Sequence, residues 1–271
     1  MRRWGLVALL SLACALSFRL TQQSAPAAIG VASPALSVLM VALGGSRGIL
    51  AEILWWRLAD LQQQSRFAEM VPLTELLVTL EPSSADAWAY NAWNLAYNIS
   101  AAHRDAAEKW RWVKRGVALV ARGLEAMPRS VVLLRQMGWL WEDKIGGSLD
   151  DAAAFYRAHL AELPPPPPEE AARFAQSLHL AAPDWKQARL RALYWYWRAG
   201  HDPDQLRVLS ALVRERPAGD QYLPCFLDAL TRAWPELAPP QRQQVRHFLH
   251  ERFGAQVDAL LQKLPEEEPA P

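Results

Sequence analysis

The residues in this chain that could bind a metal are its histidines and the acidic residues near them. The six histidines are dispersed along the sequence, at positions 103, 159, 179, 201, 247 and 250. Only His247 and His250 are spaced to share an ion, on one face of a helix with Glu251 adjacent. Because a zinc site takes three or four protein ligands, we expect these histidines to be structural or solvent-exposed.

The sequence offers little else that could catalyse a reaction. No glycine-rich phosphate loop follows a predicted strand, and no nucleophile-elbow or paired-cysteine motif occurs. Only two cysteines are present, Cys14 and Cys225, which excludes a disulfide framework. We therefore expect no enzymatic activity, no cofactor and no metal. The alternative is an accessory or degenerate enzyme of the cell envelope, with a metal site near the C-terminal helices.

Three asparagines are the most informative polar residues. Asn91, Asn94 and Asn98 follow a spacing of three and then four, beside an apolar stripe, although helix interiors disfavour asparagine. One hypothesis is that they bind the backbone of a protein partner through their paired amide donors and acceptors. The other, slightly favoured, is that they satisfy backbone carbonyls where a long connection from Ile99 to Glu108 leaves the helix.

The composition indicates which kind of fold positions these residues. The chain has 271 residues, of which 51% are hydrophobic and 21% charged, so it can bury a sizeable core. Lys and Arg number 29 against 28 Asp and Glu, so the total charge gives no reason to expect a nucleic-acid partner. Good helix formers dominate and runs of alternating β-branched residues are absent, which predicts an all-α protein.

The apolar spacing predicts helical hairpins. Trp88, Ala92 and Leu95 fall on one helix face, and Pro128 ends a second apolar helix. Six tryptophans lie between residues 88 and 141, at spacings that place them on buried sides. Two further hairpins are predicted, over residues 49–82 and 131–164. The closing prolines, at positions 82, 128 and 164, are 46 and 36 residues apart, which indicates an imperfect repeat.

This pattern resembles tetratricopeptide repeats, which have a unit of about 34 residues. The matching positions are Trp88, Ala92, Leu95, Gly116 and Pro128 in one unit, and Leu134, Gly138, Trp141, Ala152 and Pro164 in the next. The resemblance covers residues 49–164. It implies a solenoid of helical hairpins whose first helices line a groove for a protein or peptide.

A closer resemblance is to uncharacterised membrane-anchored repeat proteins of planctomycete and verrucomicrobial type. Its marks are a Gly-Gly-x-Arg-Gly motif before the first hairpin (residues 44–48), the segment Ala92–Ser100, and the segment Trp110–Val113. The resemblance implies an architecture and a membrane anchor, and it implies no activity.

The N-terminus is predicted to direct the chain to a membrane. Arg2 and Arg3 precede an uncharged apolar run from Trp4 to Phe18, which suits either a signal peptide or an anchor. A second apolar stretch, Ala27–Leu43, is interrupted by glycine and proline, so we favour a single crossing. The arginines hold the N-terminus inside. We therefore expect a bacterial inner-membrane protein whose repeats lie in the periplasm.

The rest of the chain is predicted to be further helices. A run of five prolines, Pro164–Pro168, suits a stiff spacer better than a ligand for a proline-binding domain. Helices are predicted at 169–180, 186–200, 203–217, 221–233 and 241–264. We divide the chain into a membrane segment (1–48), tetratricopeptide-like repeats (49–164), further hairpins (165–264) and a disordered acidic tail (265–271).

Overall fold

A computed structural model of the chain describes residues 47–181, 183–215 and 221–254. Within these ranges every regular element is a helix and no strand occurs, which confirms the all-α prediction. The two apolar stretches predicted to reach the membrane and the acidic tail lie outside the described residues. Among the helices that are described, none is both long and apolar enough to cross a bilayer.

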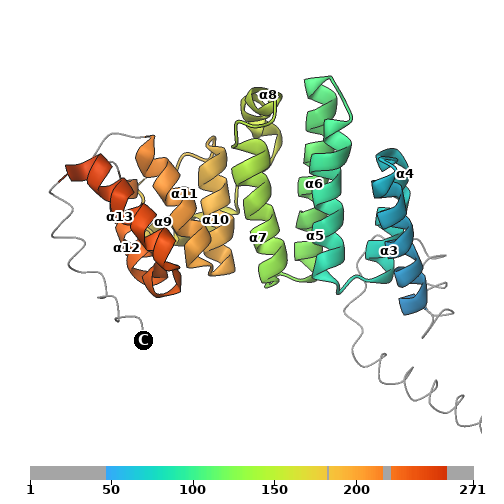
Figure 1. The fold of residues 1–271 in the computed structure, drawn as a ribbon, viewed down its shortest axis with the longest axis horizontal. Helices are drawn as coiled ribbons and strands as arrows, with labels where there is room; N and C mark the ends of the chain where they lie inside the picture. The colour runs from blue at the N-terminus through green and yellow to red at the C-terminus, as the bar shows by residue number, and fades with distance from the viewer. Residues whose placement is uncertain (1–46, 182, 216–220, 255–271) are drawn as a thin grey trace, which may run out of the picture.

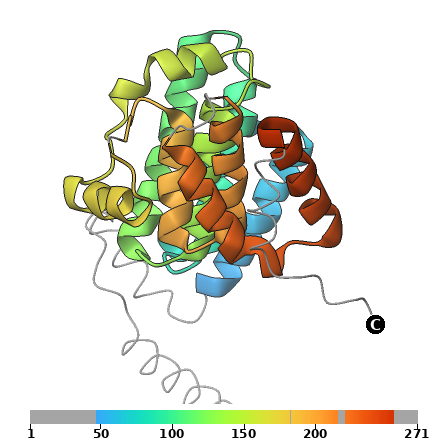
Figure 2. The same cartoon turned by 90° about the vertical axis from the view of Figure 1, so that its left-hand side faces the viewer.

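The helices pack in antiparallel pairs that stand side by side in one row (Figure 1). Their bounds are α3 (Arg47–Gln63), α4 (Phe67–Leu80), α5 (Ala85–Trp93), α6 (Ala106–Ala126), α7 (Val131–Trp139), α8 (Ala153–Ala158), α9 (Pro168–Ser177), α10 (Ala188–Ala199), α11 (Asp202–Arg214), α12 (Tyr222–Ala233) and α13 (Pro239–Phe253). Figure 2 shows that the row is curved, because α3 and α4 at one end and α13 at the other project to the same side. The short helices α8 and α9 lie on the opposite side.

Polar side chains at the helix starts define where the pairs begin. The hydroxyl oxygen of Ser84 accepts a hydrogen bond from the backbone N–H of Ala87 at 3.3 Å, which caps α5 as the sequence suggests. Ser130 caps α7 in the same way, at 3.4 Å from the N–H of Leu133. Each cap satisfies one of the N–H groups that a helix start leaves without a partner.

The first helices of two successive pairs contain an unusual backbone. Without a break, α5 continues into a π-helical segment, η2 (Asn94–Ile99), and α7 continues into a second one, η3 (Leu140–Ile145). The long connection expected from Ile99 to Glu108 is therefore wrong. The helix runs on past Ile99, and α6 begins already at Ala106, leaving a short loop. Single π turns inside α-helices are rare overall, but those that occur are often found at functional sites.

The helices approach closely where small residues meet. A Cβ added at Gly116 would lie 2.8 Å from the backbone oxygen of Ala92, and one added at Gly138 would lie 2.5 Å from the ring of Tyr196. The remaining apolar repeat positions, Trp88, Ala92, Leu95 and Trp141, are buried in the core. Pro128 and Pro164 are exposed beyond the ends of their helices. The repeat positions inferred from sequence therefore lie where neighbouring helices touch or end.

Candidate functional site

Two of the three asparagines lie inside the molecule. Asn91 and Asn94 are both 0% exposed, which favours the second hypothesis, a structural role, over contact with a partner. The amide nitrogen of Asn91 donates to the backbone oxygen of Ala87 at 2.7 Å, and its Oδ1 accepts from the Thr74 hydroxyl at 2.9 Å. Thr74 belongs to α4, so this side chain joins two helical pairs through polar groups that are satisfied without water.

The third asparagine continues the same network. Asn94 Nδ2 donates to the sulfur of Met70 at 3.6 Å, and its Oδ1 accepts from the amide of half-buried Asn98 at 2.9 Å. Burial arises because Met70 and Thr74, from the preceding pair, cover this side of α5. The asparagines hold the helices together and leave the outer side of α5 to other residues.

The outer side of the first helices carries a contiguous line of aromatic rings. We call it the aromatic row and define it as Trp55, Tyr90, Trp93, Tyr97 and Trp139. Successive ring centroids are 5.2 Å apart for Trp55 and Tyr90, 6.4 Å for Tyr90 and Trp93, and 5.8 Å for Trp93 and Tyr97. Trp139 lies beside the Tyr97 hydroxyl. The row therefore crosses three successive helical pairs, from α3 through α5 and η2 to α7.

Polar contacts from within the molecule fix these rings in place. The indole N–H of Trp55 donates to Glu81 at 3.3 Å, and the Tyr97 hydroxyl donates to Asp143 at 2.7 Å. Tyr90 donates to the Gln62 side chain. These hydrogen bonds already hold the rings in one orientation. A partner that binds to their apolar faces would therefore restrict them little further, and the loss of side-chain entropy on binding would be small. Trp139 is 41% exposed and the other four rings are half-buried.

The pKa of Tyr97 reflects the same position. Burial raises the pKa of the Tyr97 phenol, and the hydrogen bond and negative charge of Asp143 raise it further. This hydroxyl therefore stays protonated and keeps donating to Asp143 throughout the physiological pH range. Asp143 lies in η3, so the bond joins the two π-helical segments directly.

An ionic network closes the row beside Trp139. Arg207 of α11 donates to Glu142 at 2.7 and 2.8 Å and to Asp204 at 2.6 Å, and its guanidinium lies 5.9 Å from the Trp139 ring centroid. Arg135 of α7 adds a second bond to Asp204, at 2.7 Å. Burial opposes ionisation of Asp204, but the hydrogen bonds from Arg135 and Arg207 outweigh it and lower the pKa of this carboxyl.

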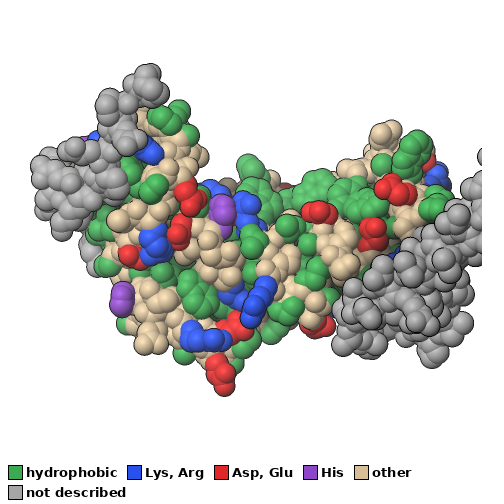
Figure 3. Space-filling model, turned by 90° about the horizontal axis from the view of Figure 1, so that it is seen from below, with side chains coloured by type: hydrophobic (Ala, Val, Ile, Leu, Met, Phe, Trp, Pro, Cys, Tyr) green, Lys and Arg blue, Asp and Glu red, His purple; other side chains and the backbone are tan. Residues whose placement is uncertain are grey.

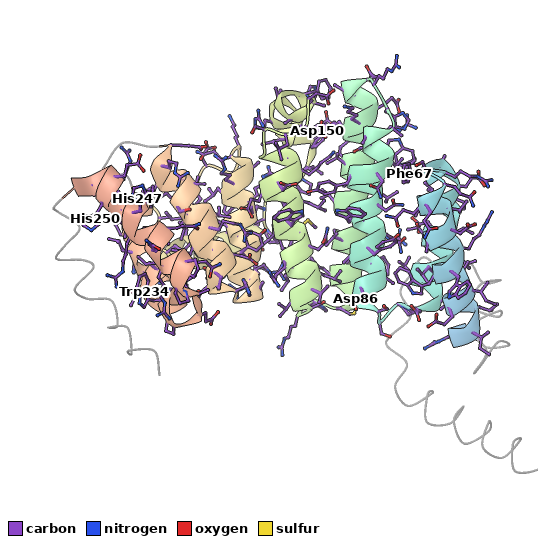
Figure 4. All side chains as sticks on the ribbon, viewed as in Figure 1. Phe67, Asp86, Asp150, Trp234, His247 and His250 are labelled. Carbon is purple, nitrogen blue, oxygen red and sulfur yellow. The ribbon has the colours of Figure 1, made fainter. Side chains whose placement is uncertain are left out.

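A second ionic cluster lies where η3 meets the loop before α8. Lys144 is 5% exposed and donates to Asp150, which also accepts from the backbone N–H of Ala152 at 2.9 Å. Burial opposes ionisation of Asp150, yet the bonds from Lys144 and Ala152 lower the pKa of its carboxyl. Figure 4 shows Asp150 near the middle of the row of helices, at their upper ends. This arrangement joins the end of η3 to the loop before α8.

The other candidate residues are two exposed histidines and a buried cysteine. His247 and His250 lie on α13 (Figure 4), and within the described ranges no three His, Cys, Asp or Glu side chains gather as a metal would require. The thiol of Cys225 is buried, donates to the backbone oxygen of Leu178 at 2.7 Å, and has its pKa raised to about 11 by burial. A thiol in that state is a poor nucleophile.

Several aromatic residues outside the row pack within the molecule. Trp110 is buried and donates to Glu162 at 3.1 Å, whereas Trp112 stacks on His103 at 6.0 Å. Tyr194 packs edge-on against Phe174, at 5.8 Å. These rings contribute to packing inside the molecule.

Sequence reasoning missed the aromatic row, although one signal was available. Trp93 and Trp139 are 46 residues apart, as are Tyr97 and Asp143, and this is the spacing of the closing prolines at 82 and 128. No family model, no curated protein and no solved structure matches this chain. The aromatic row and its polar supports are therefore the observations from which a function is inferred.

Proposed function

We propose that this chain is a membrane-tethered helical-repeat scaffold, without catalysis of its own, that binds a protein or peptide along the aromatic row. The observation that carries the proposal is that four rings from two successive helical pairs form one half-buried line, and that Trp139 of the next pair interacts with the last of them at the Tyr97 hydroxyl. Tryptophan and tyrosine are enriched where proteins bind proteins, because they contribute a large apolar area with few rotatable bonds.

The shape of the molecule leaves room for an elongated partner. Seen from below, the outline is hollowed along its middle, and hydrophobic side chains gather along the hollowed edge (Figure 3). An elongated partner segment would contact several pairs at once. A line of rings is better suited to an elongated segment than a single deep pocket is, because each ring can bury a separate small part of the segment.

The proposal includes a tetratricopeptide-like solenoid. The first helices of two successive pairs match position by position at a spacing of 46 residues, with capping serines at their starts and small residues, Ala92 and Gly138, at equivalent positions. Helical pairs that bury apolar faces only against their neighbours are the defining property of solenoids. The resemblance to membrane-anchored repeat proteins of planctomycete and verrucomicrobial type belongs to the same proposal.

The tether and the compartment follow from the N-terminal sequence. Arg2 and Arg3 before the apolar run favour a cytoplasmic N-terminus, and a single crossing then places the repeats in the periplasm. Alkaline phosphatase fused after Pro271 should be active, because that enzyme needs an oxidising compartment for its disulfides. An inactive phosphatase together with a fluorescent cytoplasmic reporter at the same site would overturn this topology.

The binding proposal is tested by removing two rings from the row. The Trp93→Ala/Trp139→Ala double variant of the full chain should lose about tenfold or more of the protein that is crosslinked and co-purified from native membranes, since each central aromatic contributes ~1–2 kcal/mol. The matched control is Trp112→Ala, a half-buried tryptophan of α6 that stacks on His103. Equal recovery with the double variant and wild type would reject the row as the binding site.

A further inference from the structure

Most of the tryptophans that the structure describes have a basic side chain of the same molecule over the ring. Arg115 lies 4.6 Å from the ring centroid of Trp112, and Arg191 lies 4.7 Å from that of Trp141. The same arrangement occurs at Trp88, Trp110, Trp139, Trp195 and Trp234. The negative face of an aromatic ring attracts a cation within about 6 Å of its centroid. The chain therefore pairs most of its indole rings with its own cations.

The part of the aromatic row on α3 and α5 lacks such a cation. Within the described ranges, no lysine or arginine lies over the rings of Trp55, Tyr90 or Trp93. Tyr97 and Trp139, at the other end of the row, do have one, at 5.1 and 5.9 Å from the ring centroids. The three rings without a cation are half-buried, so each can still be reached from outside. A cation supplied by a partner would complete a pairing that the chain makes at most of its other tryptophans.

The carboxylates beside these rings also lack a basic partner. Glu81 accepts from the indole N–H of Trp55 at 3.3 Å, and Asp143 accepts from the tyrosine hydroxyl of η2 at 2.7 Å. Asp86 is exposed and precedes Tyr90 by four residues, which places it on the same face of α5, at the lower end of that helix in Figure 4. In the part of the chain that the structure describes, none of these three carboxylates makes an ion pair. Their charges therefore favour a cation from outside the molecule.

We propose that the aromatic row binds an extended peptide segment with lysine or arginine side chains, which rest on the rings of Trp55, Tyr90 and Trp93 and pair with the carboxylates beside them. This inference rests on the proposed function and adds the chemistry of the partner. The ring faces and the carboxylates are different groups at the same place, and both favour a cation. Several rings in a line bind several side chains of one segment, as an extended peptide presents them. Anionic lipid headgroups would be repelled by the same carboxylates.

The other end of the row indicates where the basic residues of the segment lie. Beside Trp139, Arg207 is already bound to Glu142 and Asp204, at 2.7 and 2.6 Å. A second cation would be repelled by this arginine. Val132 precedes Trp139 by seven residues on the same face of α7, and both side chains are exposed. We therefore expect apolar residues of the segment at α7 and basic residues over α3 and α5.

Selection from a random peptide library tests the proposal. Ten-residue peptides displayed on phage are selected on the full chain in nanodiscs of phosphatidylethanolamine, a lipid without net charge. Lysine and arginine should be enriched at least about threefold over the starting library, because each contact between a cation and a ring increases the affinity about two- to fivefold. Apolar residues should be enriched on one side of the basic residues.

A charge variant that keeps the hydrogen-bond acceptors isolates the contribution of the carboxylates. In Glu81→Gln/Asp86→Asn/Asp143→Asn, the new amide oxygens can still accept from Trp55 and Tyr97, so the rings stay in place. The control removes three exposed charges from helices outside the row, in Glu125→Gln/Glu169→Gln/Glu236→Gln. By fluorescence anisotropy, the most enriched peptide should bind the first variant about tenfold more weakly than wild type, and the control as tightly as wild type. Acetylating or replacing the basic residues of the peptide should weaken its binding to wild type to a similar extent.

The ring variant Trp93→Ala/Trp139→Ala separates failure of this inference from failure of the proposed function. Selected peptides without basic residues that lose their binding to the ring variant would overturn the inference and support the row as a binding site. Peptides that bind the ring variant as tightly as wild type, or a selection that enriches no peptide, would reject the row and the inference together. Equal affinity of a basic peptide for the charge variant and its control would overturn the inference alone.

Discussion

The helix formed by α5 and η2 and the helix formed by α7 and η3 are two versions of one design. Both begin with a capping serine, both change to a π-helical segment after nine residues, and both carry a tryptophan at the last α-helical position. Those tryptophans, Trp93 and Trp139, belong to the aromatic row. The Tyr97 hydroxyl joins the two π-helical segments by its bond to Asp143, at the equivalent position 46 residues later.

The two helices differ in their buried polar chemistry. Asn91, Asn94 and Asn98 of the first correspond to Met137, Leu140 and Lys144 of the second. The amide network is thus replaced by two apolar residues and a buried lysine paired with an acid. The same backbone forms with either chemistry, so the asparagines do not cause the π-helical turn. Apart from the capping serine and the π-helical segment, the two helices share the half-exposed tryptophan at the last α-helical position. This shared ring is the reason that we propose the aromatic row as the partner-binding surface.

The largest expected effect concerns the innermost position of the first helix. Trp88 is 2% exposed, and its indole N–H donates to the backbone oxygen of Pro82 at 3.1 Å. Trp88→Ala should lower the free energy of unfolding by about 3–5 kcal/mol, because it leaves a large cavity. Leu134→Ala, at the equivalent position of the second helix, should cost about 2–4 kcal/mol. Urea unfolding followed by circular dichroism measures both, and an unchanged midpoint for Trp88→Ala would contradict its packing role.

The next prediction compares the stability contributed by the ionic cluster around Asp150 with that contributed by the amide network of the asparagines. Lys144→Met removes the ammonium that donates to the Asp150 carboxylate, which keeps only the Ala152 N–H, the Tyr156 hydroxyl and Lys109 at 4.0 Å, and this should cost about 3 kcal/mol. Asn98→Ala, at the equivalent position, removes one neutral hydrogen bond and should cost about 1 kcal/mol. Equal losses in the same unfolding assay would mean that the two helices depend on their polar groups to the same extent, contrary to our comparison.

The close helix contact gives a smaller effect. Gly138→Ala adds a methyl group 2.5 Å from the buried ring of Tyr196, so the ring or the helix must shift, at a cost of about 1–3 kcal/mol. The reverse change in the first helix, Ala92→Gly, should cost about 1 kcal/mol through helix propensity. If Gly138→Ala were stabilising, the two helices α7 and α10 would be packed less tightly than the structure indicates.

The smallest effect is the response to acid. The lowered pKa values of Asp150 and Asp204 mean that the unfolded chain binds protons more readily than the folded chain. Their contribution to stability is therefore present above the ordinary carboxyl pKa of about 4 and is lost as the pH falls through the lower folded values. The melting temperature of wild type should fall below about pH 4. Asp204→Asn should melt lower at neutral pH and lose less on acidification; a parallel decline would contradict this assignment.

Much of the fold could be predicted from the sequence, because apolar periodicity and capping residues are local signals. The positions of Trp88 and Leu95 on a buried face followed from a period of about 3.6 residues. The π-helical segments could not be predicted this way, because their wider turn breaks that period. The error over Ile99–Glu108 has this origin. The burial of Asn91 depends on Thr74, and the row depends on the Tyr97–Asp143 pair, and no local pattern specifies such distant contacts.

The central claim is that the aromatic row is the partner-binding surface. The most direct measurement is photocrosslinking in native membranes from Trp139→Cys labelled with a benzophenone, in the Cys14→Ser background, against the same label on the exposed Arg111→Cys of α6. Our account predicts a discrete protein crosslink from position 139 that is at least about tenfold stronger than the crosslink from position 111. Adding Trp93→Ala should reduce the crosslink from position 139 by about tenfold, since one central aromatic contributes ~1–2 kcal/mol. Equal crosslinking from both positions, or a crosslink from position 139 that Trp93→Ala leaves unchanged, would contradict it.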